Sequence, residues 1–173
     1  MLDRYDMQSS NLSAVSNART VKERAASFAP VLLAEDDSEL RTLVADTLRS
    51  DGFQVVEARD GFELLDRIEA AIAWGGRSHP PISLVITDVR MPGMSGVDVL
   101  TILRCAYWAT PVILVSAFAD ATLRREAREL GATAVLAKPF DLDELRDAVR
   151  AAVLRPADEA VRSLPRRPRA PGS

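Results

Sequence analysis

The sequence predicts an α/β domain in which five strand–helix units build a doubly wound parallel sheet, covered by helices on both faces. Three observations carry this prediction. Several short segments are almost wholly apolar, as expected for strands buried on both faces. Longer segments between them repeat apolar residues at helical spacing, and the alternation of the two patterns is typical of α/β folds. The length of 173 residues accommodates one such domain with short extensions.

The expected strands are recognised by their apolar runs. In chain order they are Val31–Ala34, the extended segment Phe53–Ala58, Ile82–Thr87, Val112–Val115 and Ala134–Ala137. Because these runs are apolar throughout rather than alternating, they fit a parallel sheet with both faces covered.

The expected helices follow the strands one by one. They are Ser38–Ser50, Gly61–Trp74, Val97–Tyr107, Asp120–Leu130 and Asp141–Leu154. Four of them place apolar or small residues on one face: Leu40, Leu43, Val44 and Thr47 in the first; Phe62, Leu65, Ile68 and Ile72 in the second; Leu123, Ala127 and Leu130 in the fourth; Leu142, Leu145, Val149 and Ala152 in the fifth. Asp51-Gly52 ends the first helix, Met91–Gly96 forms a turn, and Gly131 ends the fourth helix.

Composition excludes several classes of protein. Hydrophobic residues make up 47% and charged residues 27% of the chain, which is ordinary for a globular protein. No apolar run approaches the ~18–20 residues of a membrane span, and the first residues lack an apolar signal segment. One cysteine, Cys105, and one histidine exclude a disulfide framework and a Cys/His zinc cluster. We therefore expect a cytoplasmic protein without a membrane partner.

The chain divides into three expected regions. Residues 1–29 are a polar N-terminal extension expected to be flexible, residues 30–154 form the domain, and residues 155–173 are a Pro/Arg-rich tail expected to be disordered. Residues 31–154 carry 13 basic and 20 acidic side chains, so the domain does not favour nucleic-acid binding.

Polar residues follow four of the expected strands, at the sheet edge where α/β folds bind their ligands. They are Glu35, Asp36 and Asp37 after the first strand, Asp88 after Ile82–Thr87, Ser116 after the fourth strand and Lys138 after the fifth. Each has a plain structural explanation: the acids can cap a helix, Asp88 can form a turn, and a lysine is usually exposed.

The combination points to phosphoryl chemistry. Carboxylates gathered at one edge repel each other unless a cation joins them, and oxygen ligands suit Mg²⁺. Lys138 and Ser116 supply the cationic and hydroxyl donors that a phosphoryl group needs. A carboxylate between a metal and such donors can act as a nucleophile. The residues alone therefore suggest phosphoryl transfer to an aspartate.

Four segments resemble the receiver domain of two-component response regulators, in the family's order and spacing. They are VLLAEDDSELR, LVITDVRMPGMSGVDVL, PVILVSAFA and GATAVLAKPF, and the similarity covers about residues 30–154. The resemblance implies a flavodoxin-like (βα)5 fold with strand order 2-1-3-4-5. It also implies a stand-alone signalling domain that catalyses only its own phosphorylation and dephosphorylation, and not an enzyme acting on an external substrate.

The same resemblance assigns roles residue by residue. Asp88 corresponds to the phosphoacceptor and is also expected to be a Mg²⁺ ligand. Asp36 corresponds to a direct Mg²⁺ ligand and Glu35 to an acid that holds the ion through water. The backbone carbonyl of Arg90 would complete the protein ligands. Lys138 would pair with the phosphoryl oxygens, and its bond to Pro139 is expected to be cis. Ser116 would donate its hydroxyl to the phosphoryl group.

Two departures from the family stand out. Val135 occupies the position where the family commonly has Tyr or Phe, whose ring couples phosphorylation to the output face, so the usual aromatic switch is in doubt. Arg90 and Phe118, two residues beyond Asp88 and Ser116, occupy positions that tune the phosphoryl lifetime in the family. We expect the bulk of Phe118 to hinder water and to give a lifetime longer than minutes.

The expected partners follow from the family. A sensor histidine kinase or a histidine phosphotransfer protein would supply the phosphoryl group. The domain would then act in a phosphorelay or switch the binding of a protein partner through the last two helices and the last strand. Homodimer formation on phosphorylation is left open.

Three alternatives belong to other classes. The runner-up is a non-phosphorylated scaffold that keeps the fold, against which the intact Asp36, Asp88 and Lys138 argue. A nucleic-acid-binding role for Arg162–Arg169 conflicts with the acidic body. A hydrolase with an aspartyl-phosphate intermediate would need an acid two residues after Asp88, where Arg90 stands.

Overall fold

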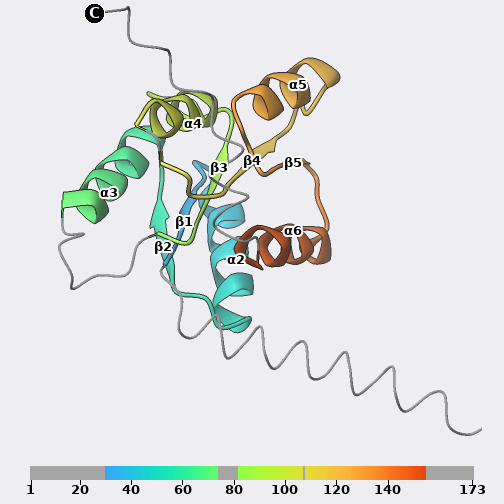
Figure 1. Cartoon of the computed structure of the whole chain (residues 1–173). Coiled ribbons are helices and arrows are strands. Elements are labelled where there is room, and N and C mark those ends of the chain that lie inside the picture. The colour runs from blue at the N-terminus through green and yellow to red at the C-terminus, as the bar shows by residue number, and fades with distance from the viewer. Residues whose placement is uncertain (1–29, 74–81, 107, 155–173) are drawn as a thin grey trace, which may run out of the picture.

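The computed structural model describes residues 30–73, 82–106 and 108–154, which form the α/β domain that the sequence predicts (Figure 1). Its elements are, in chain order, β1 (Val31–Ala34), α2 (Ser38–Ser50), β2 (Val55–Ala58), α3 (Gly61–Ala73), β3 (Leu84–Asp88), α4 (Gly96–Cys105), β4 (Val112–Ser116), α5 (Ala121–Glu129), β5 (Ala134–Ala137) and α6 (Leu142–Leu154). The expectations for residues 1–29 and 155–173 lie outside the described residues.

The strands form one parallel sheet in the order β2-β1-β3-β4-β5, as expected. Val31 of β1 pairs with Val55 of β2 on one side and with Leu84 of β3 on the other. The strand order therefore changes direction between β1 and β3. In open α/β sheets this reversal opens a crevice beyond the carboxyl ends of the strands. The fold therefore places its ligand crevice directly after Ala34 and Asp88.

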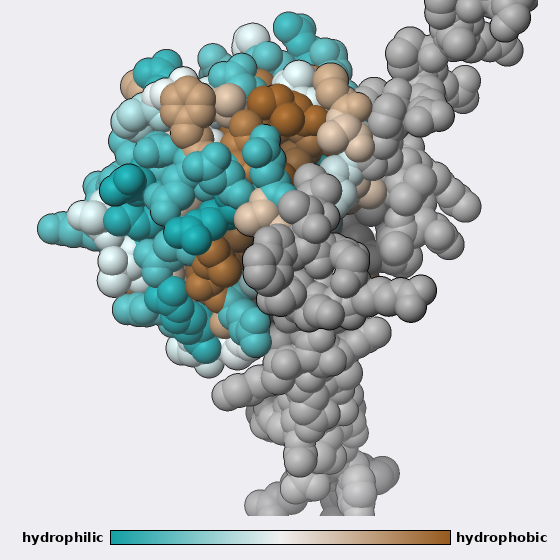
Figure 2. All heavy atoms as spheres, turned by 90° about the vertical axis from the view of Figure 1, so that its left-hand side faces the viewer, coloured by the Kyte–Doolittle hydropathy of each residue, from teal (hydrophilic) through white to brown (hydrophobic). Residues whose placement is uncertain are grey.

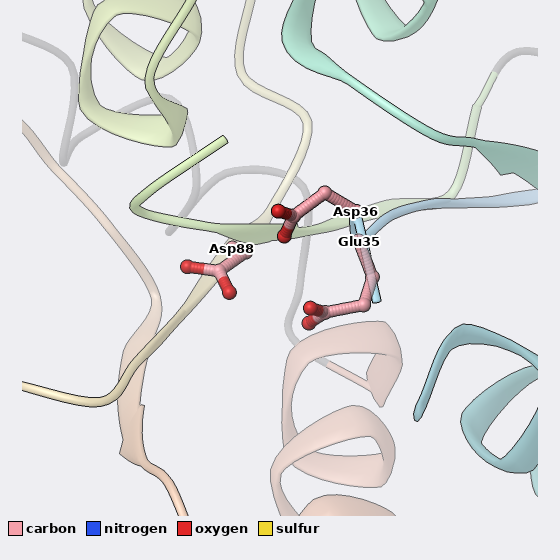
Figure 3. Close-up of side chains that lie close together, drawn as sticks. All are labelled: Glu35, Asp36 and Asp88. Carbon is pink, nitrogen blue, oxygen red and sulfur yellow. The ribbon is translucent and has the colours of Figure 1, made fainter. Parts of the chain in front are cut away.

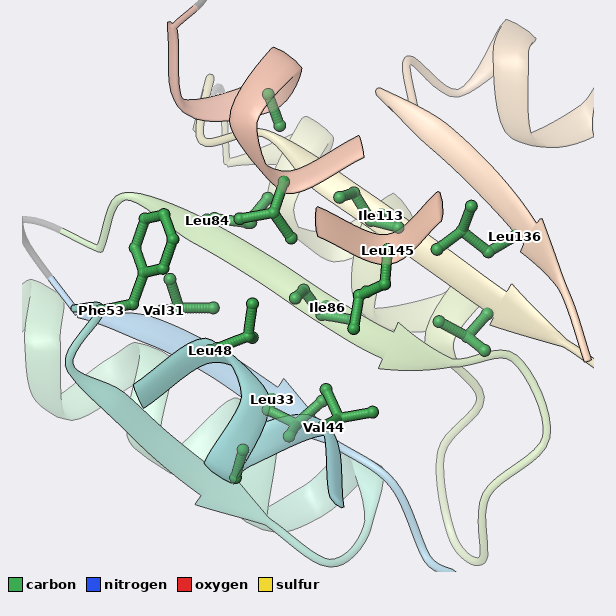
Figure 4. Packing of buried hydrophobic residues seen from close by; sticks show 14 residues of the cluster. Val31, Leu33, Val44, Leu48, Phe53, Leu84, Ile86, Ile113, Leu136 and Leu145 are labelled. Carbon is green, nitrogen blue, oxygen red and sulfur yellow. The ribbon is translucent and has the colours of Figure 1, made fainter. Parts of the chain in front are cut away.

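Helices cover both faces of the sheet, as Figure 1 shows. On one face, Leu48 of α2 and Leu145 of α6 pack against alternate strand residues such as Leu33 and Ile86 (Figure 4). On the other face, α3, α4 and α5 pack against the intervening residues, among them Leu32 and Leu114. Because both side-chain directions are buried, β1, β3 and β4 are apolar at nearly every position.

The two helical faces predicted for α2 and α3 are wrong in part. Leu43 is 50% exposed, because Val44 and Leu48 are the α2 residues that face the sheet. Phe62 is 56% exposed, whereas Leu64 and Ile68, four residues apart on one face of α3, are buried.

Strand ends also differ slightly from the prediction. Asp88 and Ser116 are the last residues of β3 and β4 rather than the first residues after them. Both side chains are nonetheless at the carboxyl edge of the sheet, so their expected location is unchanged. Gly131 has a φ of 81° just after the end of α5, the left-handed conformation for which glycine is favoured.

Large hydrophobic side chains are scarce on the surface of the described residues. Figure 2 shows the face that carries α3 and α4, where hydrophilic residues predominate and hydrophobic ones gather in small patches. The large hydrophobic residues that are exposed are Leu43, Phe62, Ile102, Phe118 and Leu154. None of the described helices is long and apolar enough to cross a membrane.

Candidate functional site

Three carboxylates meet at the carboxyl ends of β1 and β3. Glu35, Asp36 and Asp88 each offer an oxygen, and these oxygens lie within 4.8 Å of one another (Figure 3). Glu35 and Asp88 are buried, whereas Asp36 is exposed. Since each carboxylate is repelled by the other two, the cluster favours a nearby cation.

Lys138 supplies one cation from the neighbouring end of β5. Its Nζ lies 2.7 Å from Oε2 of Glu35, and it also contacts Oδ2 of Asp88. Burial opposes the charge of this ammonium, but its hydrogen bonds to Asp88 and Glu35 outweigh that effect and raise the pKa of Lys138. Burial raises the pKa of Glu35, and the hydrogen bond from Lys138 offsets part of that shift. Lys138 is therefore fully charged at neutral pH and bound between two carboxylates.

The loop after β3 is folded tightly against Asp88. The backbone N–H of Arg90 donates to Oδ1 of Asp88 at 2.7 Å, so one carboxylate oxygen is oriented by the loop and the other by Lys138. Gly96 begins α4 beneath this loop, where an added Cβ would lie 2.4 Å from the carbonyl oxygen of Asp88. The close approach of α4 to the strand end therefore requires glycine at this position.

Ser116 lies at the end of β4, beside β3. Its side chain is buried, and its Oγ accepts a hydrogen bond from the N–H of Phe118 at 3.1 Å. Its carbonyl accepts from the N–H of Lys138 at 2.8 Å, which ties the ends of β4 and β5 together. The expected cis bond between Lys138 and Pro139 is present.

The predicted site residues Glu35, Asp36, Asp88, Arg90, Ser116 and Lys138 thus come from four strand ends and lie at one edge of the sheet. Asp37, interpreted as a helix cap, does cap α2: its Oδ1 accepts from the N–H groups of Glu39 and Leu40. Its pKa is lowered by these two bonds, first of all by that from Leu40.

The donor set fits a hard divalent cation. Three carboxylates within 4.8 Å of one another make an all-oxygen site of the type that Mg²⁺ prefers. With a single ammonium shared between Glu35 and Asp88, the cluster keeps excess negative charge. A bound Mg²⁺ would supply further positive charge for the oxygens of a phosphoryl group at this edge.

Val135 and Arg124 form an unexpected contact at the sheet edge. Val135 is half-buried in β5 and packs on the α3–α4–α5 face. Its carbonyl accepts from Nη1 of Arg124 at 2.9 Å, while Nε of Arg124 donates to the carbonyl of Ala119 at 3.0 Å. The position that the family commonly fills with an aromatic ring is thus bonded to α5 through its backbone.

Sequence comparison agrees with this geometry. The family model described as "Response regulator receiver domain" matches residues 31–150. The chain belongs to this family. As a receiver domain of the two-component response regulators, it is a phosphoacceptor domain of phosphorelay signalling.

The match covers nearly all of some curated relatives and little more than half of others. The receiver domain is 32% identical over 120 residues to sporulation initiation phosphotransferase F of Bacillus subtilis, covering 69% of this chain and 90% of that protein. It is 37% identical over 126 residues to the transcriptional regulatory protein PdtaR of Mycobacterium tuberculosis, covering 72% of this chain but 57% of that protein. The chain therefore spans little more than half the length of some of its relatives.

Solved structures show the same fold. The chemotaxis protein CheY4 of Vibrio cholerae superposes with a TM-score of 0.62 and 28% identity, covering 72% of this chain and 98% of CheY4. A response regulator receiver domain from Clostridium thermocellum gives a TM-score of 0.64 at 27% identity, covering 73% and 94% of the two chains.

Sequence reasoning missed three contacts at this site. They are the ion pair of Lys138 with Glu35, the stacking of Arg90 on Phe118, and the hydrogen bonds of Arg41 to the backbone of the acidic loop. The position of Arg41, one helical turn after the acids, could have indicated the last of these.

Proposed function

We propose that this receiver domain takes a phosphoryl group from the phosphohistidine of a sensor kinase or a phosphotransfer protein onto Asp88, in a reaction that requires Mg²⁺. One observation carries the proposal. The Asp88 carboxylate is buried at the switch point of the sheet, with Lys138 on one oxygen, a backbone N–H on the other and two further acids beside it. This arrangement orients a nucleophile, and Lys138 together with a bound Mg²⁺ would neutralise the charge of an incoming phosphoryl group.

The proposed transfer forms one bond to phosphorus and breaks another. A carboxylate oxygen of Asp88 forms a bond to phosphorus while the P–N bond to the donor imidazole breaks, and the imidazole keeps the electron pair. Lys138 and the hydroxyl of Ser116 donate hydrogen bonds to the phosphoryl oxygens. Dephosphorylation is a separate step, in which a water oxygen forms a bond to phosphorus while the bond between phosphorus and the Asp88 oxygen breaks. It releases inorganic phosphate and restores the carboxylate. Glu35 and Asp36 would hold the ion, together with the carbonyl of Arg90.

The donor protein needs a surface beside Lys138, and the described residues contain a suitable one. A pocket of about 370 Å³ lies next to the site, lined by Leu40, Leu43, Lys138, Pro139, Phe140 and Leu142. Its lining is mostly apolar, and Leu43 is half exposed at its rim. We assign this pocket to the phosphodonor because a protein docked there reaches Lys138 directly.

The output surface is proposed on α5, β5 and α6. Arg124, Arg125 and Arg128 of α5 form no ion pair with the described residues, whereas the arginines of α2, α3 and α6 are paired with carboxylates. Arg124 donates to two backbone carbonyls, and a helix whose arginines have no carboxylate partner in the described part of the chain, on an acidic domain, suits a protein that offers acidic groups. The domain acts here as a signalling switch in the cytoplasm, alone or in a phosphorelay, and not on an external substrate.

Intact mass tests the proposal. Wild type and Asp88→Asn are incubated with acetyl phosphate and Mg²⁺, and the mass of each is measured. One added phosphoryl group on the wild type alone supports the phosphoacceptor role of Asp88. No addition to the folded wild type would favour the alternative, a receiver-like scaffold that binds partners without phosphorylation. If the wild type were still labelled when Mg²⁺ is chelated before acetyl phosphate is added, the metal requirement would be contradicted.

A further inference from the structure

Arg41 lies at the end of the first turn of α2, and its side chain extends back towards the loop that carries Glu35 and Asp36. Its Nη1 donates to the carbonyl of Glu35 at 2.7 Å and lies 3.5 Å from the carbonyl of Asp36. Its Nε lies 3.5 Å from Oε2 of Glu57 on β2. The side chain is only 19% exposed, so the guanidinium bridges β2 and the loop in a largely buried position.

The neighbouring residues of the loop are held as well. The N–H of Glu35 donates to the carbonyl of Ala58 in β2 at 3.2 Å. Asp37 is fixed as the cap of α2 through its side chain. Asp36 is the exposed acid between these two fixed residues. Arg41 binds the backbone carbonyl of Glu35, the residue that joins Asp36 to β1.

We propose that Arg41 is a positioning residue, which fixes the backbone of Glu35 and Asp36 so that their carboxylates face Asp88. This inference rests on the proposed function, since the carboxylates that it orients are the proposed Mg²⁺ ligands. The hydrogen bonds of Arg41 to Glu35 and Asp36 go to their backbone carbonyls, so it orients these ligands without neutralising their carboxylates. Groups that orient metal ligands contribute strongly to metal affinity although they do not touch the ion.

The direction in which the Kd for Mg²⁺ changes when Arg41 is removed separates this positioning role from a purely electrostatic one. A guanidinium near a cation site repels the cation, so its removal should strengthen Mg²⁺ binding if charge alone mattered. If Arg41 positions the ligands, its removal weakens binding. We expect Arg41→Gln to raise the Kd for Mg²⁺ about tenfold, the lower end of the range for lost orienting groups.

Arg49 provides a matched control on the same helix. Its Nη2 donates to Oε1 of Glu57 at 2.7 Å and to the carbonyl of Val55 at 3.2 Å, but it makes no contact with the acidic loop. Arg49→Gln therefore removes one positive charge and the contacts of Arg49 with Asp46, Val55 and Glu57, while leaving Glu35 and Asp36 untouched. Its Kd for Mg²⁺ is expected to equal that of the wild type.

The experiment is a calorimetric titration of the full chain with MgCl₂, for wild type, Arg41→Gln, Arg49→Gln and Glu57→Gln. Glu57→Gln weakens the anchor of Arg41 and should raise the Kd less than Arg41→Gln does. If Arg41→Gln does not fold, Glu57→Gln tests the same role of Arg41. An unchanged or lower Kd in the folded Arg41→Gln protein would overturn the proposal, as would an equal increase in Arg49→Gln.

A metal-free measurement makes the two proposals distinguishable. Amide ¹⁵N relaxation at residues 35–37 should show greater mobility in Arg41→Gln than in Arg49→Gln, without any added ion. If the wild type bound no Mg²⁺, the proposed metal requirement would fail, and the relaxation data would still decide whether Arg41 fixes the loop. Equal mobility in the two variants would overturn the role of Arg41 even if the wild type binds Mg²⁺ and is phosphorylated.

Discussion

The guanidinium of Arg90 lies over the ring of Phe118, with Cζ 4.5 Å from the ring centroid. Arg90 follows Asp88, the proposed phosphoacceptor, by two residues, and Phe118 follows Ser116 by two. The pair therefore bridges the two loops on either side of the proposed phosphorylation site. We expect the pair to cover a route by which water would approach a phosphoryl group on Asp88.

Removing this cover should shorten the life of the phosphorylated form. A cation–π pair at an exposed site contributes about 0.5–1 kcal/mol, so we expect Phe118→Ala to accelerate phosphate release about threefold. The fraction phosphorylated is followed by intact mass after the donor is removed. Leu154→Ala, which also removes an exposed apolar side chain, serves as the control and should match the wild type. Phosphate release from the wild type within seconds would contradict the expected long lifetime.

Asp36→Asn should stabilise the metal-free domain and abolish its response to Mg²⁺. Three carboxylates within 4.8 Å of one another share a single ammonium, so loss of one charge relieves repulsion. We expect a Tm a few degrees higher without metal, corresponding to about 1 kcal/mol. Added Mg²⁺ should raise the Tm of the wild type and not that of the variant. A Tm that rises equally in both proteins would show that the ion binds elsewhere.

The fold was predictable because its pattern is local. The bounds of the apolar strands β1 and β5 were predicted as the structure has them. A strand buried on both faces is apolar at every position, so the first polar residue marks its end. The faces of α2 and α3 were harder. Leu43 and Phe62 fit the helical period as well as their buried neighbours do, and only the docking angle of each helix decides which one faces the sheet.

The site was predictable in position but not in contacts. Asp88 and Lys138 lie 50 residues apart in the chain, and their meeting follows from the strand order, which the family motifs supplied. The side-chain contacts of Arg41 and Phe118 depend on rotamers and loop paths that no periodicity encodes. The role of Val135 in place of an aromatic residue likewise stays a prediction, although its bond to Arg124 offers a different link to α5.

Leu43→Asp should impair phosphorylation by a protein donor and leave that by acetyl phosphate intact. Leu43 lines the pocket beside Lys138 and is 50% exposed, so a carboxylate there costs little stability but opposes apolar docking. We expect transfer from a histidine phosphotransfer protein that labels the wild type to slow about tenfold, as for loss of an interface contact worth about 1.4 kcal/mol. Ile102→Asp, on α4, is the control. Equal rates for wild type and Leu43→Asp would exclude this pocket as the donor surface.

Arg104 holds together the opposite end of the sheet. It is 4% exposed and donates to the carbonyls of Trp108 and Thr110 before β4 and of Gly131 before β5, at 2.6, 3.1 and 2.9 Å. Burial lowers the pKa of Arg104 to about 10, so the group is still charged at neutral pH. Among the described residues, it has no carboxylate partner, and its charge is stabilised by carbonyl dipoles alone.

Arg104→Ala should therefore destabilise the domain by about 3 kcal/mol, because three buried or partly buried carbonyls lose a charged donor and a cavity replaces the side chain. Urea unfolding measures the change, and Arg128→Ala, an exposed arginine of α5, should have little effect. Arg104→Met keeps most of the apolar stem and removes the charge, so it separates packing from charge. If Arg104→Met proved as stable as the wild type, the desolvation of the guanidinium would offset its three hydrogen bonds, and Arg104 would contribute by packing alone.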